Sequence, residues 1–185
     1  MTLTPNAPAS VEVEGVSWPV QGAQVAMIED GKIVLQLRPW PPGWELPGGH
    51  CDAGEDPAVT AAREVEEETG YRIRIDRVVG VYTWGGLRNA GDVLYLAAIV
   101  GGRPRRSLEA WALHHVAPDE IPRTLFPWMR QRVLDAFACA ADSSPVHRVQ
   151  PVTLYHVASF ATAWMQAPLD RLRRRRSRRS SRRDT

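Results

Sequence analysis

Three glutamates within five residues carry the clearest chemistry in this sequence. Glu64 lies three residues before Glu67 and four before Glu68, and on a helix these spacings place all three carboxylates on one side. Their charges repel one another, and Arg63 neutralises only part of the charge. Magnesium and manganese prefer oxygen ligands, and protein-bound magnesium often also binds substrate phosphates. The cluster therefore predicts a divalent metal site that acts on phosphate or diphosphate groups.

A helix over residues 57–69 is expected to position these glutamates. Pro57 suits the first helical turn, Asp56 is a suitable N-cap, and Gly70 suits the C-terminal end. Gly49 lies in the loop before the helix, where glycine lets the backbone approach a ligand closely. Its carbonyl oxygen is therefore a further candidate metal ligand.

The remaining pattern predicts an α/β or α+β domain, because strands and helices are interleaved. A second, amphipathic helix is expected at 126–141. A loop is expected at 39–43, since three closely spaced prolines should not continue a strand ladder. Strands are expected at 24–28, 33–37, 72–84, 92–100 and 109–116.

The charge of the chain is divided unevenly along its 185 residues. Residues 171–185 hold nine arginines and one aspartate, a net +8, so the preceding 170 residues carry −6 of the total of +2. The acidic body does not suggest a nucleic-acid platform, but the arginine-rich tail alone could bind polyanions non-specifically. We expect an N-terminal arm at 1–17, a folded domain at 18–141, and a linker with a disordered tail at 142–185.

Two further features suggest a cytoplasmic protein. Cys51 and Cys139 are far apart and lack partners at metal-ligand spacing, which fits a reducing compartment better than a disulfide scaffold. Residues 150–169 carry no formal charge, but they contain too many polar residues and prolines for a membrane span. We therefore predict no transmembrane helix.

Residues 49–71 resemble the Nudix box. Every defined position matches in one register: Gly49, five residues, Glu55, seven residues, Arg63-Glu64-Val65, one residue, Glu67-Glu68, one residue, Gly70-Tyr71. The lead-in at 44–49 and the segment from Trp111 to Pro122 also resemble the family, so the resemblance covers roughly residues 20–140. It implies a Nudix-type α/β/α sandwich with a mixed β-sheet. It also implies a pyrophosphohydrolase that depends on Mg2+ or Mn2+.

The resemblance also implies roles for individual residues. Glu67 and Glu68 correspond to the core metal ligands, and Glu64 to a ligand or catalytic base. Arg63 corresponds to an arginine that orients a box glutamate through a charge-assisted bond, and Glu55 to a glutamate that supports the box. The implied set of metal ligands is Gly49, Glu64, Glu67 and Glu68.

Some family members recruit a base from outside the box, and Glu109 is our candidate because it starts the expected strand near Trp111. Substrate contacts are less specific. Tryptophan faces could stack on a nucleobase and arginines could reach phosphates. The candidate substrate-binding residues are Arg38, Trp44, Trp84 and Arg88.

The substrate itself stays open at this point. The resemblance implies a small nucleotide, either a nucleoside triphosphate, its deoxy form, or a sugar-linked nucleoside diphosphate. Markers of ADP-ribose and dinucleoside polyphosphate hydrolases are missing downstream of the box. Two alternatives are an RNA decapping or processing enzyme that uses the tail for affinity, and a nucleotide sensor without turnover. The three intact box glutamates favour an enzyme, and dimers are frequent in this family, so a homodimer is also considered.

Overall fold

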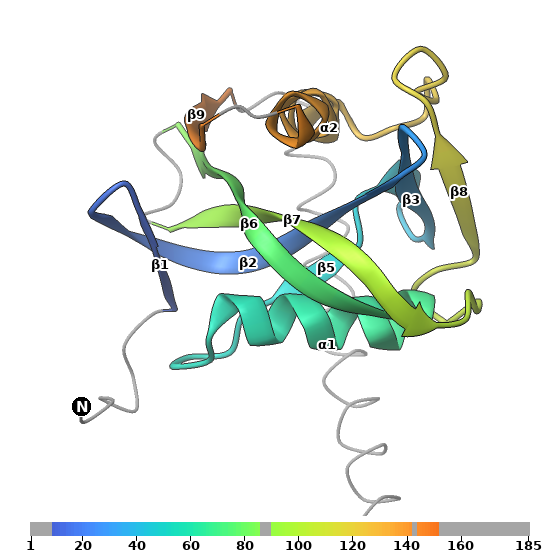
Figure 1. The fold of residues 1–185 in the computed structure, drawn as a ribbon, viewed down its shortest axis with the longest axis horizontal. Helices are drawn as coiled ribbons and strands as arrows, with labels where there is room; N and C mark the ends of the chain where they lie inside the picture. The colour runs from blue at the N-terminus through green and yellow to red at the C-terminus, as the bar shows by residue number, and fades with distance from the viewer. Residues whose placement is uncertain (1–8, 86–89, 142–143, 152–185) are drawn as a thin grey trace, which may run out of the picture. The chain divides into compact units, whose positions relative to one another are not determined.

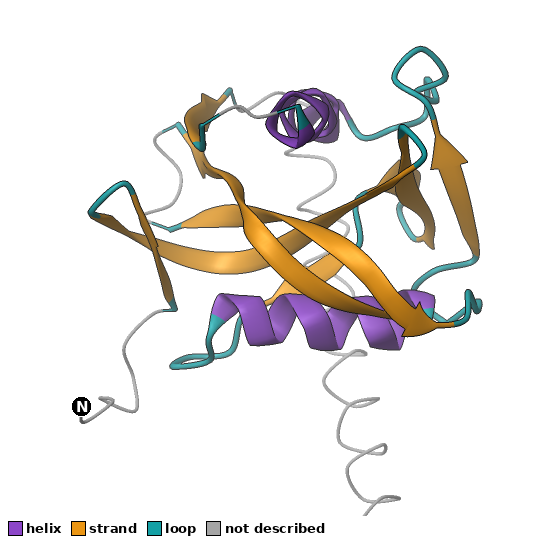
Figure 2. Ribbon diagram, in the orientation of Figure 1, coloured by secondary structure: helices purple, strands orange, loops and turns teal. Residues whose placement is uncertain are grey.

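In the computed structural model, residues 9–85, 90–141 and 144–151 are described. These residues form a mixed β-sheet with one helix on each of its faces (Figures 1 and 2). This arrangement confirms the expected α/β/α layers with a mixed sheet. No helix within the described ranges is long and apolar enough to span a membrane.

The elements have the following bounds. The helices are α1 (Pro57–Thr69) and α2 (Pro127–Ala140). The strands are β1 (Ser10–Val13), β2 (Val16–Glu29), β3 (Lys32–Pro39), β4 (Pro42–Glu45), β5 (Gly48–His50), β6 (Tyr71–Trp84), β7 (Gly91–Gly102), β8 (Ala112–Val116) and β9 (Val146–Gln150).

The sheet is ordered β4-β3-β2-β7-β6-β9, with β1 and β5 paired to β2 and β8 paired to β3. The pairs β2–β7 and β6–β9 are parallel, and the other pairs are antiparallel. Strand β2 is therefore the centre of the sheet, with neighbours along both of its edges. Strand β5 runs directly into the loop before α1, so pairing with β2 fixes where α1 begins.

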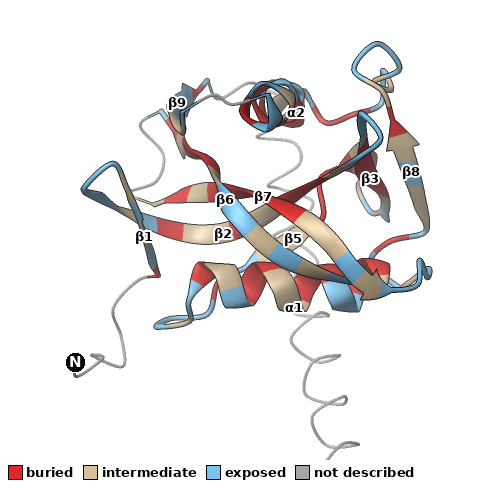
Figure 3. Cartoon of the chain, in the orientation of Figure 1, coloured by how far each residue is buried: buried red, intermediate tan, exposed pale blue. Residues whose placement is uncertain are grey.

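Two apolar clusters pack the helices against the sheet, one on each face. On the α1 side, Ala61 and Val65 pack with Val25 of β2, and on the α2 side, Val133 packs with Ala26 of the same strand. Successive side chains of a strand point to opposite faces, so β2 contributes to both clusters. Figure 3 shows the buried residues concentrated in the strands between the helices. The helix carrying the glutamates is thus fixed to the sheet by its apolar face.

The ends of α1 agree with the signals in the sequence. The Asp56 carboxylate accepts a 2.8 Å hydrogen bond from the backbone N–H of Ala58, and Pro57 occupies the first turn. Gly70 ends the helix with φ 78°, a left-handed conformation that glycine adopts without steric cost. The prediction of a helix at 57–69 is confirmed residue for residue.

The expected loop at 39–43 is partly wrong. Pro39 and Pro42 form the last paired positions of the β3–β4 hairpin, and the turn between them contains a cis Trp40–Pro41 peptide bond. Prolines are tolerated there because they lie at strand ends beside a two-residue turn, where the missing N–H disrupts no continuing ladder.

The expected strand at 109–116 is shorter than predicted. Strand β8 begins at Ala112, and Glu109 lies in the segment before it. The Ser107 hydroxyl accepts hydrogen bonds from the backbone N–H groups of Glu109 and Ala110, at 3.2 and 2.9 Å. This local turn directs the backbone donors to a side chain, so they are not available for a strand ladder.

The sheet also extends beyond the expected folded region of 18–141. Strand β1 lies within the expected arm at 1–17, and β9 lies within the expected linker and tail at 142–185. The chain divides into two units after Pro151, and the arginine-rich tail lies outside the described residues. Both missed strands are short and pair at edges of the sheet, so neither has a strong pattern of its own.

Strand β9 is bound to the rest of the domain by a buried arginine. Arg132 of α2 is 1% exposed and donates hydrogen bonds to Gln150 of β9 at 2.6 Å and to Asp92 of β7 at 2.9 Å. It also donates to the side-chain oxygen of Gln24 in β2. A buried guanidinium needs such partners, because burying an unpaired charge is costly. The cluster therefore joins α2 and three strands.

We predict that Gln150→Leu destabilises the full-length protein by about 2 kcal/mol, because it leaves a buried donor without its acceptor. Urea unfolding followed by circular dichroism measures the change. The matched control is Val149→Ala, since Val149 is the neighbouring residue in β9 and is 63% exposed. Equal free energies of unfolding for the two variants would contradict a structural role for β9.

Candidate active site

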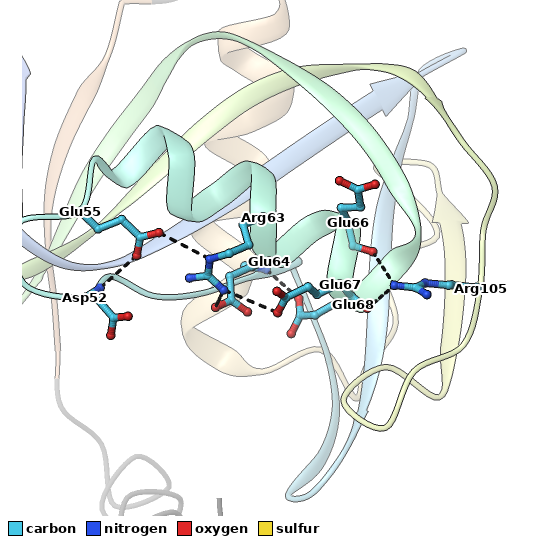
Figure 4. Close-up of polar contacts among 9 residues, drawn as sticks. Asp52, Glu55, Arg63, Glu64, Glu66, Glu67, Glu68 and Arg105 are labelled. Atoms are coloured by element: carbon cyan, nitrogen blue, oxygen red, sulfur yellow. Dashed lines mark hydrogen bonds and ion pairs between the residues drawn. The ribbon is translucent and has the colours of Figure 1, made fainter. Parts of the chain in front are cut away.

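The three box glutamates lie along one side of α1 but differ in exposure. Glu64 and Glu68 are buried and Glu67 is exposed. Figure 4 shows their carboxylates gathered near Arg63, whereas the side chain of Glu66 points away from them. The expected clustering of these glutamates by helical spacing is therefore present in the fold.

A fourth carboxylate reaches this cluster from a different part of the chain. Carboxylate oxygens of Glu64, Glu68 and Glu109 lie within 4.8 Å of one another. Glu109 is exposed and belongs to the segment between β7 and β8. The structure thus places the residue that we selected outside the box beside the box itself, although that residue precedes the strand on which we expected it.

Arg63 contacts several of these carboxylates. Its Nη1 lies 2.7 Å from Glu64 and 3.6 Å from Glu67, and its Nε lies 3.5 Å from Glu55 (Figure 4). Glu55 also accepts a 3.3 Å hydrogen bond from the backbone N–H of Asp52. Arg63 thus contacts two box glutamates and Glu55 contacts Arg63, while their roles in orienting and supporting the box stay predictions.

Glu68 is held from the opposite side by the sheet. Its carboxylate accepts hydrogen bonds from the backbone N–H of Gly48 at 3.0 Å and from the side-chain amide of Gln36 at 2.9 Å. The Gln36 amide also lies 3.5 Å from the carboxylate of Glu45, which in turn pairs with Arg38 at 3.4 Å. Polar contacts therefore connect Arg38, on the surface, to the buried Glu68.

Gln36 and Glu45 were not among the residues expected at the site. The sequence contains a signal for Gln36, because it is the only polar residue between Ile33 and Leu37. In the structure, Gln36 is fully buried. Its side-chain oxygen has no hydrogen-bond partner among the described residues. A polar residue in an otherwise apolar strand needs a buried partner, and here that partner is Glu68.

Burial and like charge both act on the acidic groups. Burial raises the pKa of Glu68 to about 8, and the nearby charges of Glu45 and Glu64 act in the same direction. Burial also raises the pKa of Glu64, to which the charges of Glu67 and Glu109 add, while Arg63 opposes the shift. Burial thus favours the neutral form of both carboxyl groups, and a bound cation would favour their charged form instead.

Gly49 approaches the cluster closely. A side-chain carbon at this position would overlap the carboxylate group of Glu64, so only glycine leaves room for that group. Residues 48–50 pair with β2, which holds this backbone in place against α1. The glycine is thus required for close approach, whereas metal binding by its carbonyl oxygen stays a prediction.

The candidate substrate contacts are spread over different regions. Arg38 is exposed beside Glu45, and Trp44 is half-buried against His114, with ring centroids 5.7 Å apart. Trp84 is buried and lies edge-on to Trp128 of α2, with centroids 6.2 Å apart. Arg88 lies outside the described residues. Of the three candidates that the structure describes, Arg38 has contacts that lead through Glu45 and Gln36 to the acidic cluster.

This chain is similar in sequence to known proteins. The family profile described as the NUDIX domain matches residues 19–137. A MutT-like protein of Streptomyces ambofaciens is 35% identical over 126 residues, covering 66% of this chain and 81% of that protein. A CMP-5'-(N-acetyl-N-hydroxy-3-aminopropyl)phosphonate hydrolase of Streptomyces rubellomurinus is 47% identical over 116 residues. That match covers 56% of this chain but only 55% of the relative.

The fold has matches among solved structures as well. The crystal structure of an ADP-ribose pyrophosphatase from Streptococcus suis superimposes with a TM-score of 0.61 and covers 70% of this chain and 97% of that chain. Its sequence identity is 22%, so the likeness concerns the arrangement of helices and strands alone.

The raised pKa of Glu68 predicts how stability depends on pH without metal. Between the ordinary value of 4.5 and about 8, the folded protein keeps a proton that the unfolded chain has lost. In EDTA, the free energy of unfolding should therefore fall as pH rises through this range. Thermal unfolding of wild type and Glu68→Gln at several pH values measures the trend, and the variant should show a smaller decrease. An equal pH dependence of stability in the two proteins would contradict the raised pKa of Glu68.

Proposed function

Since this chain belongs to the Nudix hydrolase family, we propose that it hydrolyses the P–O–P anhydride of a nucleoside diphosphate linked to another moiety. Nucleoside triphosphates, their deoxy forms and sugar-linked nucleoside diphosphates are the substrate classes considered. The observation that carries this proposal is the convergence of Glu64, Glu68 and Glu109 within 4.8 Å. The box glutamates Glu64, Glu67 and Glu68 are all present, which favours an enzyme over a nucleotide sensor.

The donor set of the site fits Mg2+ or Mn2+. Its atoms are carboxylate oxygens, which these hard cations prefer, and Arg63 contacts Glu64 and Glu67 but balances only part of the charge. When bound, the cation would neutralise the diphosphate and polarise its phosphorus. The residues that would hold it are Glu64, Glu67 and Glu68, with the carbonyl oxygen of Gly49 as a further ligand, and Glu109 adds a negative charge beside them.

The protein's own groups then have distinct tasks. Arg63 fixes the carboxylates of Glu64 and Glu67, and Gln36 and the Gly48 N–H fix Glu68. We assign the exposed Glu109 as the base that accepts a proton from the attacking water. The water oxygen bonds to one phosphorus, and the bond to the bridging oxygen breaks, so the second phosphate leaves with the electron pair.

The similarity to a hydrolase acting on a CMP-linked phosphonate adds one substrate class to the test. Its name describes a cytidine nucleotide joined to a phosphonate, and an anhydride between those two groups is chemically close to a diphosphate. At 47% identity this relative supports including cytidine nucleotides among the substrates. The whole-protein activity is carried over only as a proposal, because the chain spans about half of that relative.

Processing of RNA is the second candidate, and the arginine-rich residues 171–185 are the observation that favours it. Arginine clusters bind phosphate backbones with strong salt dependence. Comparing the full chain with one ending at Pro151, which retains β9, separates the two functions. If the shortened chain lost turnover of 5′-triphosphate RNA but kept its turnover of small nucleotides, RNA processing would be supported.

A cytoplasmic location and a homodimer both stay predictions. Cys51 and Cys139 are both buried, and neither forms a disulfide bond. Cysteines kept out of disulfide bonds are typical of reducing compartments, which supports the first of these predictions.

We predict that Glu67→Gln lowers kcat by about two to three orders of magnitude, because it removes charge that acts on the transition state. The fold should persist, since Glu67 is exposed. The matched control is Glu66→Gln, which removes the same charge from the adjacent residue, whose side chain points away from the site (Figure 4). Steady-state kinetics in Mg2+ measures both variants, and equal activity would contradict the site assignment.

A phosphate-release screen tests the function as a whole. The purified protein is mixed with NTPs, dNTPs, ADP-ribose, sugar-linked and cytidine nucleotides and 5′-triphosphate RNA, in Mg2+ or Mn2+, with coupled phosphatases. Metal-dependent turnover that Glu67→Gln abolishes would establish the enzyme and its substrate class. Silence across the panel, together with nucleotide-induced thermal stabilisation, would instead support the sensor alternative.

A further inference from the structure

The segment between β7 and β8 is attached to the C-terminal end of α1, the helix that carries the box glutamates. The backbone N–H of Arg103 donates to the carbonyl of Gly70 at 3.2 Å, and that of Arg105 donates to the carbonyl of Thr69 at 2.9 Å. Carbonyl groups at the end of a helix lack partners within the helix. The segment therefore supplies donors that the helix end requires.

The side chain of Arg105 adds a second attachment. Its Nη2 donates to the backbone carbonyls of Glu66 at 3.2 Å and Glu67 at 3.4 Å (Figure 4). A cation at the C-terminus of a helix also interacts favourably with the helix dipole. The Arg105 guanidinium thus binds the backbone of the same turn that presents Glu67 and Glu68 to the site.

Gly70 makes this close attachment feasible. A side-chain carbon at Gly70 would overlap the carbonyl oxygen of Arg103 and would lie 2.7 Å from the side chain of Arg105. This glycine therefore both ends α1 and leaves the space into which the segment packs.

Beyond Arg105, a tight turn directs the chain to Glu109. The Ser107 hydroxyl accepts hydrogen bonds from the N–H groups of Glu109 and Ala110, and the Ser107 N–H donates to the carbonyl of Ala110 at 2.8 Å. Ala110 is fully buried, so packing also holds this end of the turn in place. Only three residues thus lie between Arg105 and Glu109, whose carboxylate lies within 4.8 Å of those of Glu64 and Glu68.

We propose that Arg105 is a positioning residue, which sets the distance of Glu109 from the box carboxylates by fastening its segment to α1. The proposal rests on the function proposed above, in which Glu109 accepts the proton of the attacking water. Because the anchor and the box glutamates share one helix, any movement of α1 moves Glu109 with it. Arg105 itself binds backbone carbonyls and has no direct part in the chemistry.

A double-mutant cycle tests this role with Arg105→Leu, Glu109→Gln and the double variant. Activity on the best nucleotide of the panel gives kcat/KM, and Mn2+ titration followed by electron paramagnetic resonance gives metal affinity without substrate. We expect Arg105→Leu to lower both by about ten-fold in the wild-type background, as for coupled neighbours, and by less than about two-fold once Glu109 is replaced. The matched control Arg106→Leu, which removes an exposed arginine of the same segment, should leave both unchanged.

Three results would overturn the proposal. Equal losses from Arg105→Leu with and without Glu109 would show that the arginine merely stabilises α1. Wild-type behaviour of Arg105→Leu would show that the backbone bonds alone hold the segment. Wild-type activity of Glu109→Gln would show that Glu109 has no catalytic role for Arg105 to support. If Glu67→Gln were inactive in the same assay, the proposed hydrolase function would still stand.

If Arg105→Leu does not fold properly, as judged by a non-cooperative unfolding transition, Ser107→Ala provides the same test without altering the contacts to α1. It removes the acceptor for the Glu109 N–H, so it should lower kcat/KM in the wild-type background and have little further effect with Glu109→Gln. Additive losses in this second cycle would likewise contradict the positioning of Glu109 by its segment.

Discussion

Negative charge buried on one side of α1 is the constraint on which the rest of this structure depends. Glu64 and Glu68 are almost inaccessible, and burying carboxylates is unfavourable unless donors or cations compensate them. The compensation comes from three separate parts of the chain: Arg63 on the helix, the Gly48 N–H before it, and Gln36 in β3. Burial nevertheless raises the pKa of Glu68 to about 8, so its charged form is disfavoured while no cation is bound. A divalent cation would favour the charged form of these carboxylates and would attract an anionic phosphate substrate.

The sheet provides the rigidity that this charge requires. Strand β2 pairs with β5 on one edge and β7 on the other, and the two apolar clusters hold α1 and α2 against its opposite faces. Groups that would otherwise separate under repulsion are thereby held at fixed distances. Preorganised charges of this kind need little rearrangement during reaction.

Much of this arrangement could be predicted from the sequence, and the exceptions have a common cause. Helix α1 was predicted correctly because its cap, its proline and its terminal glycine are all local signals. Gln36 and Glu45 were missed because their roles depend on contacts across strands that only the fold brings together. Glu109 was selected through family resemblance, but its element was wrong, since the Ser107 turn competes with strand pairing. Strand β9 was missed because what holds it, Arg132, lies on another element.

The attachment of β9 also has a consequence for where this protein can be divided. The match to the family profile ends at residue 137, whereas the sheet continues to Gln150. A fragment cut at the limit of similarity would expose the backbone of β6 along residues 80–84, where unpaired groups can recruit strands from other chains. Aggregation of such a fragment would therefore reflect a misplaced boundary and not an intrinsically unstable domain. The end of the family match is therefore a poor guide to where the sheet of this protein ends.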